Sequence, residues 1–381
     1  MANRVLFLYP DDYDATTATR RVLEAGRGLF PELKFLYWAR NGVPKETKDP
    51  FYDGIEKEVF LKVAPPRSIQ VVWITLLYQW WLLKKIRAYK PDFISAFYFY
   101  TAMPALAYKY LFNRRCKVVY DPRDYFAVCY IIHPAITWVL RLIDNIFIRL
   151  ADRVVFPDRQ FFTYYGMFRM PADKYFILPN STEDCYAKIS TDDIYERYSI
   201  PKGSIIIPLI GYFSETRGKD LFFKIIDQQP EGVHFIVAGV IRDKDDEAFF
   251  KSHSNVTFLD KIPYTQALWI MRESTFVPLL YDPASLNNKY AIPTKFYDSL
   301  MVGTPVMVSF EQTDVYELVH KHHLGYGIAY NNVDQFLEKL VILRESKHKF
   351  DAAVLREHFL KTYDFSLFKQ GLYDFYKNLI Q

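Results

Sequence analysis

The first half of the chain alternates short apolar runs with segments of helical periodicity. The helical pattern is clearest in residues 19–29. The apolar runs that predict β-strands are residues 5–9, 34–38, 93–97, 117–120 and 152–156. Because strands that alternate with helices form parallel sheets, this half predicts a Rossmann-like domain. Ligands of such a domain bind beyond the carboxyl ends of its strands.

The same alternation starts again after a junction around residues 190–201. Strands are predicted at 205–210, 233–238, 255–259, 276–279 and 305–308, with helices at 218–227 and 264–271. A chain of 381 residues is long enough for two cores of this kind. The predicted fold class is therefore α/β, with two doubly wound domains at residues 1–190 and 201–362. An amphipathic helix follows within residues 363–381.

Charge is distributed unevenly between these halves. The whole chain has a net charge of +4, whereas residues 1–180 carry +9 and the remainder −5. A basic first half favours an anionic partner. Runs of Lys and Arg interleaved with aromatic residues, which are typical of nucleic-acid binding, do not occur. The anionic partner that we expect is therefore a membrane surface and not a nucleic acid.

The cysteines and the first residues indicate a compartment. Cys116, Cys129 and Cys185 show no paired spacing, which argues against a disulfide framework and against a zinc site. The first apolar run is too short for a signal peptide. We therefore expect a protein of the reducing cytoplasm.

The most informative segment runs from Pro293 to Val306, and its pattern is that of a loop, a short helix, a glycine turn and a strand. Pro293 suits the first turn of a helix, and Gly303 ends that helix before the apolar run. The free N–H groups and the positive dipole end of such a helix favour a phosphate. Lys295 and Asp298 share one helix face, where Asp298 could bind two ribose hydroxyls.

This segment resembles the nucleotide-sugar signature of retaining glycosyltransferases of the GT-B fold, especially family four. The family pattern is roughly Pro-x-Lys-x-x-Glu-x-x-x-x-Gly-x-Pro-Val. Four shorter matches follow in the family's order, at residues 90–94, 119–124, 151–155 and 176–181. The resemblance covers most of the chain. It implies two domains facing across a cleft, with the acceptor on the first domain, the donor on the second, and the helix at 363–381 crossing back to the first.

The resemblance also implies a donor site. Arg217 matches the family's phosphate-binding Lys, and Asp298 matches its second Glu. Tyr212 stands where many members have Arg, and Lys219 is one candidate for the missing cation. Tyr290 stands where the family often has another Glu, so no carboxylate is assigned to the transferred sugar. The remaining candidate donor contacts are Gly211, Gly239, Asn287, Thr294 and Lys295.

Each of these assignments has a structural alternative. Arg217 and Lys219 could be solvated charges of an ordinary strand–turn–helix connection. Asp298 could cap or solvate its helix, and Asn287 could be a turn residue instead of a partner for sugar hydroxyls.

In the first domain, Arg123 and Asp124 occupy the strand-end position of the family's His-Asp pair. Asp124 is the candidate group that accepts the proton of the acceptor hydroxyl, and Arg123 is assigned to the same catalytic position. The alternative is that Asp124 forms a structural salt bridge with Arg123 or a neighbour. The resemblance implies a metal-independent reaction without a cofactor, on a UDP-sugar or GDP-sugar, in which fixed cations stabilise the departing diphosphate. The histidines show no metal-binding spacing.

Residues 69–87 form an apolar helix that is interrupted by Gln70, Thr75 and Gln79 and ends in cations. A membrane-spanning helix is usually purer. Tryptophans beside a basic end suit a helix that lies in the lipid headgroup region, at the inner face of a membrane. The alternative is a helix buried against the sheet.

Together these features predict a glycosyltransferase that moves a sugar from a nucleotide sugar to a glycan or lipid-linked acceptor, in the synthesis of a cell-surface polysaccharide or glycoconjugate. Two alternatives stay open. One is a nucleotide-sugar epimerase of the same fold, and the other is a catalytically silent donor-binding subunit.

Overall fold

A computed structural model describes residues 4–12, 17–44, 50–63, 70–129, 133–167, 169–241, 243–345 and 350–380. The chain forms two compact units, of which unit 1 contains residues 1–179 and 366–381 and unit 2 contains residues 180–365. The chain enters unit 2 ahead of the junction expected around residues 190–201. The expected junction itself belongs to unit 2, because Ile189, Ile194 and Ile200 are all buried in its core.

Unit 1 is built on a seven-stranded sheet with the order β3-β2-β1-β4-β5-β6-β7, in which every pair is parallel. The strands are β1 Arg4–Tyr9, β2 Glu32–Ala39, β3 Glu56–Leu61, β4 Phe93–Phe97, β5 Lys117–Asp121, β6 Arg153–Phe156 and β7 Tyr175–Ile177. The inner strands β1, β4 and β5 are almost completely buried. This burial explains their near-continuous apolar runs, since a parallel sheet is covered on both faces.

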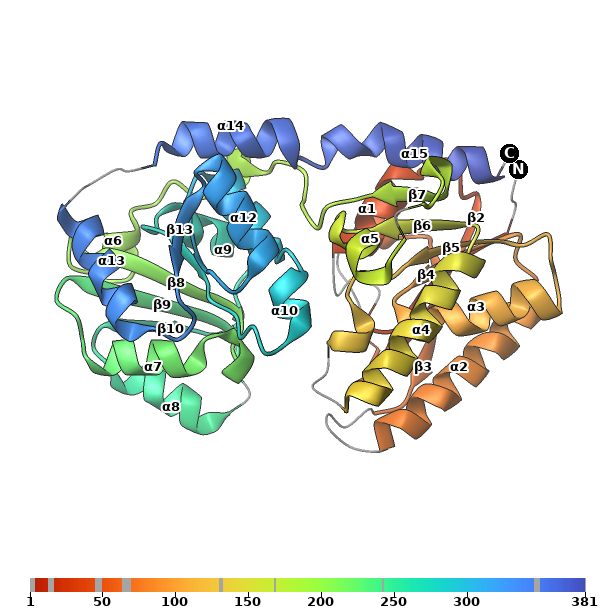
Figure 1. Cartoon of the computed structure of the whole chain (residues 1–381), viewed down its shortest axis with the longest axis horizontal. Helices are drawn as coiled ribbons and strands as arrows, with labels where there is room; N and C mark the ends of the chain where they lie inside the picture. The colour runs from red at the N-terminus through yellow and green to blue at the C-terminus, as the bar shows by residue number, and fades with distance from the viewer. Residues whose placement is uncertain are drawn as a thin grey trace. The chain divides into compact units, whose positions relative to one another are not determined.

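Helices cover both faces of this sheet. On one face lie α2 Gln70–Tyr89, α3 Phe99–Leu111 and α4 Pro134–Leu150, and on the other lie α1 Thr17–Ala25 and α15 Ser366–Ile380 (Figure 1). The short helix α5 Gln160–Tyr165 precedes β7. The hydroxyl of Tyr78 on α2 donates to the carbonyl of Tyr9 at 2.8 Å, which anchors that helix to the sheet. Tyr376 of α15 is fully buried against Phe93 of β4, with ring centroids 5.7 Å apart.

Unit 2 repeats the parallel arrangement with two three-stranded sheets, β10-β9-β8 and β11-β12-β13. The strands are β8 Ile205–Tyr212, β9 Val233–Val240, β10 Val256–Leu259, β11 Val277–Leu279, β12 Val306–Ser309 and β13 Gly325–Ile328. The two sheets adjoin at β8 and β11, where the Thr275 N–H donates to the Ile206 carbonyl at 3.0 Å. The order of the strands therefore reverses at the boundary between β8 and β11. Ligands of open α/β sheets bind at such a switch point.

Two apolar cores flank these strands. One includes residues of α9 Tyr264–Arg272, α11 Thr294–Val302, α12 Thr313–His322 and α14 Ala352–Thr362. The other includes residues of α7 Lys219–Asp227, α8 Lys244–Ser252 and α13 Val333–Glu345. The short helices α6 Ile194–Arg197 and α10 Leu286–Tyr290 complete the unit. The α/β class with parallel sheets, expected from the sequence, is confirmed.

Candidate functional site

The candidate donor site lies at the carboxyl end of β8, where two glycines bring neighbouring strands close together. Gly211 and Gly239 are opposite one another in the β8–β9 register, and both have positive φ. A Cβ atom on Gly239 would lie 2.1 Å from the Gly211 carbonyl oxygen. This distance is too short for any side chain at position 239. Glycine is therefore required at position 239 for the backbone to pack here.

Two cations and a tyrosine meet above this strand end. Arg217, Tyr281 and Lys295 all line a narrow pocket of about 20 Å³ together with Gly211. The Arg217 guanidinium carbon lies 4.2 Å from the centroid of the Tyr281 ring, and the Lys295 Nζ lies 5.8 Å from the same centroid. Lys295 also donates to the carbonyl of Ile210. The structure thus brings together Gly211, Arg217 and Lys295, which the sequence proposed from separate motifs.

Tyr281 is buried, and its hydroxyl makes no hydrogen bond of ordinary geometry with the described residues. Burial by itself raises the pKa of Tyr281, but the positive charges of Lys295 and Arg217 outweigh burial and lower it below the ordinary value. A lowered phenol pKa reports a local excess of positive charge. This is the electrostatic environment that a diphosphate requires.

Lys219, at the start of α7, has a different environment. Its Nζ is 2.5 Å from an Asp246 carboxylate oxygen, and both side chains are largely buried. Burial opposes the charged form, but the Asp246 carboxylate raises the pKa of Lys219 above its ordinary value. The ion pair neutralises this lysine. Lys219 is also absent from the residues that line the pocket of Arg217 and Lys295.

Asp298 lies one turn into α11 and is only 4% exposed. The Tyr264 hydroxyl of α9 donates to its Oδ1 at 2.7 Å, and Thr182 Oγ1 is 3.2 Å from the same hydroxyl. Loss of solvent around the hydroxyl and the adjacent Asp298 carboxylate raise the pKa of Tyr264, so this phenol donates to the carboxylate at neutral pH. One oxygen of Asp298 is therefore engaged within unit 2.

The loop between β11 and α11 carries the remaining donor candidates. Asn288 is buried and bridges two loops, since its amide donates to the carbonyls of Thr216 and Asp282. Its neighbour Asn287 is half-buried on α10, as is Tyr290 at the end of that helix. Thr294 begins α11 and is exposed.

In unit 1 the candidate catalytic pair separates into two environments. Arg123 is 4% exposed and pairs with Asp121 at 2.5 Å, whereas Asp124 is partly exposed. Burial raises the pKa of Asp121 to about 6, although Arg123 and Arg21 oppose that rise. The structural ion pair of Arg123 is thus with Asp121.

The same strand ends hold two backbone conformations that side chains rarely adopt. Tyr98, directly after β4, has a φ of 62°, and Arg123, two residues after β5, has a φ of 61°. Such conformations are maintained only where the surrounding structure enforces them, and they cluster at functional sites. They mark the carboxyl ends of β4 and β5 as the part of unit 1 most suited to binding.

Sequence reasoning missed Tyr281, Tyr264 and Tyr98. One signal was present, because Tyr281 and Tyr98 each follow a buried strand, at the edge where a parallel sheet binds its ligands. For Tyr264 no local signal existed, since its contact with Asp298 joins two helices that are 34 residues apart in sequence.

Two further findings concern metals and membranes. Within the described ranges, no group of three or more His, Cys, Asp or Glu residues could hold a metal ion. No helix in the part of the chain that the structure describes is long and apolar enough to cross a membrane.

Comparison with known proteins places the fold. No family model and no curated protein matches the sequence. Among solved structures, sucrose-phosphate synthase from Thermosynechococcus elongatus superposes with a TM-score of 0.72 at 13% identity, covering 99% of both chains. HepE from Anabaena in complex with UDP-glucose superposes with a TM-score of 0.68 at 13% identity, covering 98% of this chain and 99% of its own.

A UDP-GlcNAc 2-epimerase from Neisseria meningitidis bound to UDP-GlcNAc is also similar, with a TM-score of 0.59 at 14% identity and 99% of both chains covered. Identities this low show the fold alone. The chain has the GT-B fold, which confirms the fold class expected from the sequence.

Proposed function

We propose that the protein is a glycosyltransferase that takes a sugar from a nucleotide-sugar donor and passes it to a glycan or lipid-linked acceptor. The observation that carries this proposal is the pair of cations, Arg217 and Lys295, held beside buried Tyr281 at the carboxyl end of β8. Full-length superposition on HepE, solved in complex with UDP-glucose, supports a nucleotide sugar as the ligand of this site.

Unit 2 binds the donor in this proposal. Arg217 and Lys295 contact the diphosphate, and they stabilise the negative charge that develops as the bond to the sugar breaks. Gly211 and Gly239 allow the backbone to approach the ligand closely. Asp298 binds the ribose, and its hydrogen bond from Tyr264 fixes the orientation of the carboxylate. Asn287, Tyr290 and Thr294 lie near enough in sequence to α11 to complete the site for the sugar.

Unit 1 binds the acceptor. Asp124, which is partly exposed after β5, accepts the proton of the acceptor hydroxyl, and buried Arg123 holds the local backbone through Asp121. Finer features of the proposal are transfer of a hexose with retention, without a metal ion, from a UDP-sugar or GDP-sugar. Contact with the inner face of a membrane through residues 69–87 belongs to the same proposal, although Ile69 lies outside the described residues.

Ligand-dependent thermal unfolding tests the donor site. UDP should stabilise the wild-type protein, since a ligand that binds only the folded state raises its unfolding temperature. Arg217→Ala and Asp298→Ala should each abolish this effect. Retention of the UDP-induced shift in both variants would remove the site assignment. For Asp298→Ala, circular dichroism must first show a folded protein, because the substitution also leaves the Tyr264 hydroxyl without its acceptor.

The epimerase alternative has one observation in its favour, which is the fold similarity to UDP-GlcNAc 2-epimerase. An epimerase would isomerise the sugar while it is bound, and it would not transfer that sugar to an acceptor. Analysis of the sugar products formed from UDP-GlcNAc and UDP-glucose distinguishes the two activities.

A further inference from the structure

Unit 1 exposes an unusual concentration of large apolar side chains on α2, α3 and α4. Fifteen of the twenty-seven large apolar side chains that are exposed in the described residues lie on these three helices or on the residue that ends α3. We call them the α2–α4 surface. Its members are Val72, Trp73, Leu76, Leu77, Trp80, Met103, Tyr110, Leu111, Phe112, Ile136, Trp138, Val139, Leu142, Ile146 and Leu150.

These side chains follow the outer stripe of their helices. On α2 the inward stripe buries Tyr78, Leu82 and Ile86, so the exposed tryptophans Trp73 and Trp80 point away from the sheet. On α4 the inward stripe includes Phe147 and Ile148, and the opposite stripe is apolar as well. A helix that is apolar on both sides needs a second apolar environment besides the core.

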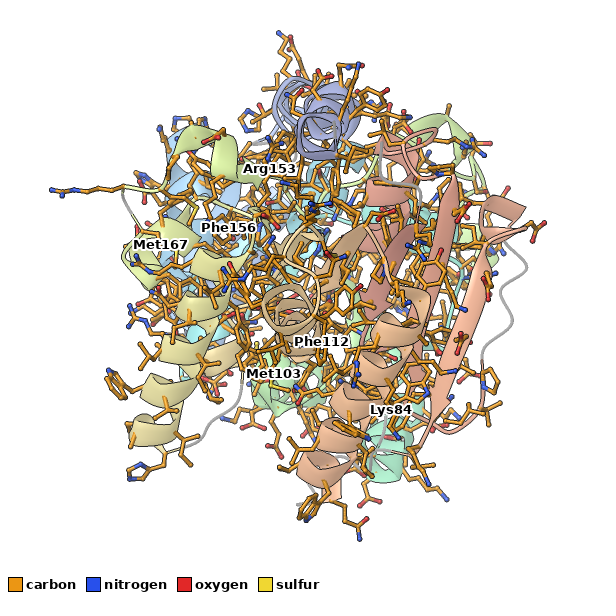
Figure 2. All side chains as sticks on the ribbon, turned by 90° about the vertical axis from the view of Figure 1, so that its right-hand side faces the viewer. Lys84, Met103, Phe112, Arg153, Phe156 and Met167 are labelled. Atoms are coloured by element: carbon orange, nitrogen blue, oxygen red, sulfur yellow. The ribbon has the colours of Figure 1, made fainter. Side chains whose placement is uncertain are left out.

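The three helices form one continuous face. The Arg87 guanidinium carbon of α2 lies 4.3 Å from the centroid of the Phe112 ring at the end of α3. The Tyr110 hydroxyl of α3 donates to the carbonyl of Leu150 on α4 at 2.9 Å. Figure 2 labels Lys84 of α2, Met103 of α3, and Phe112, the residue that follows α3.

The charges on this face are almost all positive. Lys84, Arg87, Arg141 and Arg149 are exposed on α2 and α4, and Lys85 of α2 pairs with Glu58 of β3. Among the described residues of the three helices, the one acidic side chain is Asp144, which is fully buried. Three further exposed cations, Arg114, Arg115 and Lys117, follow α3 directly.

A pocket at the C-terminal end of α4 continues this positive charge. It has a volume of about 330 Å³ and is lined by Arg149, Arg169 and Lys174, without an acidic side chain among the lining residues. Burial, together with the charge of Arg149, lowers the pKa of Lys174, although nearby carboxylates oppose that change. Met167, Met170 and Pro171 contribute apolar lining to the same pocket.

We propose that the α2–α4 surface docks unit 1 onto an anionic lipid bilayer, with α2 and α4 lying in the headgroup region on either side of α3. Exposed tryptophans beside lysine and arginine are the combination that suits the boundary between headgroups and acyl chains. A protein partner would need acidic side chains opposite these cations. An anionic bilayer supplies both negatively charged headgroups and an apolar interior. This extends the sequence expectation, which placed the contact on residues 69–87 alone, by adding α3 and α4.

Flotation of the full-length protein with phosphatidylcholine vesicles, with and without phosphatidylglycerol, tests the proposal. The wild-type protein should float with the anionic vesicles. Binding should weaken when salt is raised from roughly 0.1 M to roughly 1 M, because the Debye screening length falls from about 10 Å to about 3 Å. Trp73→Glu on α2 and Leu142→Glu on α4 should each weaken partitioning by about tenfold or more, since each removes one inserted side chain. Leu367→Glu, on α15 and similarly exposed, is the matched control and should float like the wild type.

Three results would overturn the proposal. One is the absence of flotation with either vesicle type, and another is a doubling of mass in light scattering without vesicle binding, which would assign the surface to a second copy. The third is a loss of flotation in Trp73→Glu with wild-type behaviour of Leu142→Glu, which would limit the contact to α2. UDP binding is measured on the same variants and should be unchanged, so failure of the proposed donor site remains distinguishable from failure of membrane docking.

Discussion

Replacing Lys295 by Met tests whether the cation pair beside Tyr281 is a diphosphate site. Methionine keeps most of the unbranched stem of lysine and removes only the charged end. Lys295 is half-buried and its Nζ contacts the carbonyl of Ile210, so it is held above Gly211 before any ligand arrives. A cation that is already in position loses little side-chain freedom on binding.

The expected loss follows from the kind of contact removed. A hydrogen bond to a charged group contributes about 1.5–3 kcal/mol, which corresponds to a weakening of UDP binding by about tenfold to about a hundredfold. The partial exposure of Lys295 places the expectation at the lower end, because solvent screens the charge. Uridine, which carries no phosphate, should bind the variant and the wild type equally.

Isothermal titration calorimetry with UDP and with uridine measures both quantities. Lys224→Met, on the exposed side of α7, is the control for a change of net charge. Lys219→Met separates the two interpretations of that residue, and its pairing with Asp246 predicts wild-type affinity for UDP in a folded variant. The reasoning is refuted if Lys295→Met binds UDP as tightly as Lys224→Met, or if uridine binding falls by the same factor.

Three further predictions concern pH and packing. Tyr281 has a lowered pKa, so its phenolate forms early and neutralises the cations; UDP binding should therefore weaken as the pH rises toward 10 in the wild type but not in Tyr281→Phe, and parallel titrations would contradict this. Burial raises the pKa of Asp144 from 3.8 to about 6, so the folded state holds the proton longer than the unfolded state and stability falls as the pH rises through that window. Urea unfolding should then show Asp144→Asn gaining about 3 kcal/mol relative to the wild type between pH 4 and pH 7, and a pH-independent difference would show that the carboxyl ionises normally. Gly239→Ala should destabilise unit 2 by about 1–3 kcal/mol or more, because its Cβ would lie 2.1 Å from the Gly211 oxygen, and an unchanged urea midpoint would be inconsistent with that register.

The buried strands and the edge strand β10 could be predicted from the sequence, whereas the strands β3, β7 and β13, also at sheet edges, could not. β1, β4 and β9 are apolar runs because both of their faces are covered. β3 is an edge strand whose charged residues hide the pattern, β7 has only three residues, and β13 contains two glycines. All three form because a neighbouring strand supplies hydrogen bonds, which a local sequence pattern does not record.

The candidate site divides in a similar way. Arg217 and Lys295 could be located because each belongs to a local motif at a strand end or helix start. Lys219 pairs with Asp246, and Asp298 accepts a hydrogen bond from Tyr264. Each contact joins segments that are distant in sequence, so the environments of Lys219 and Asp298 could be known only from the structure. The α2–α4 surface was foreseen only for its first helix, since the exposure of a helix face depends on what packs around it.

Donor turnover is the measurement that tests the central claim most directly. The protein is incubated with UDP-glucose, UDP-GlcNAc or a GDP-hexose, with and without vesicles that contain a membrane lipid extract as acceptor, and the nucleotide and sugar products are separated. The proposed function predicts release of the nucleoside diphosphate from one of these donors, faster with acceptor and strongly reduced in Lys295→Met. Isomerisation of the bound sugar without release would indicate an epimerase. Tight UDP binding without any turnover would contradict the claim and would indicate a silent donor-binding subunit.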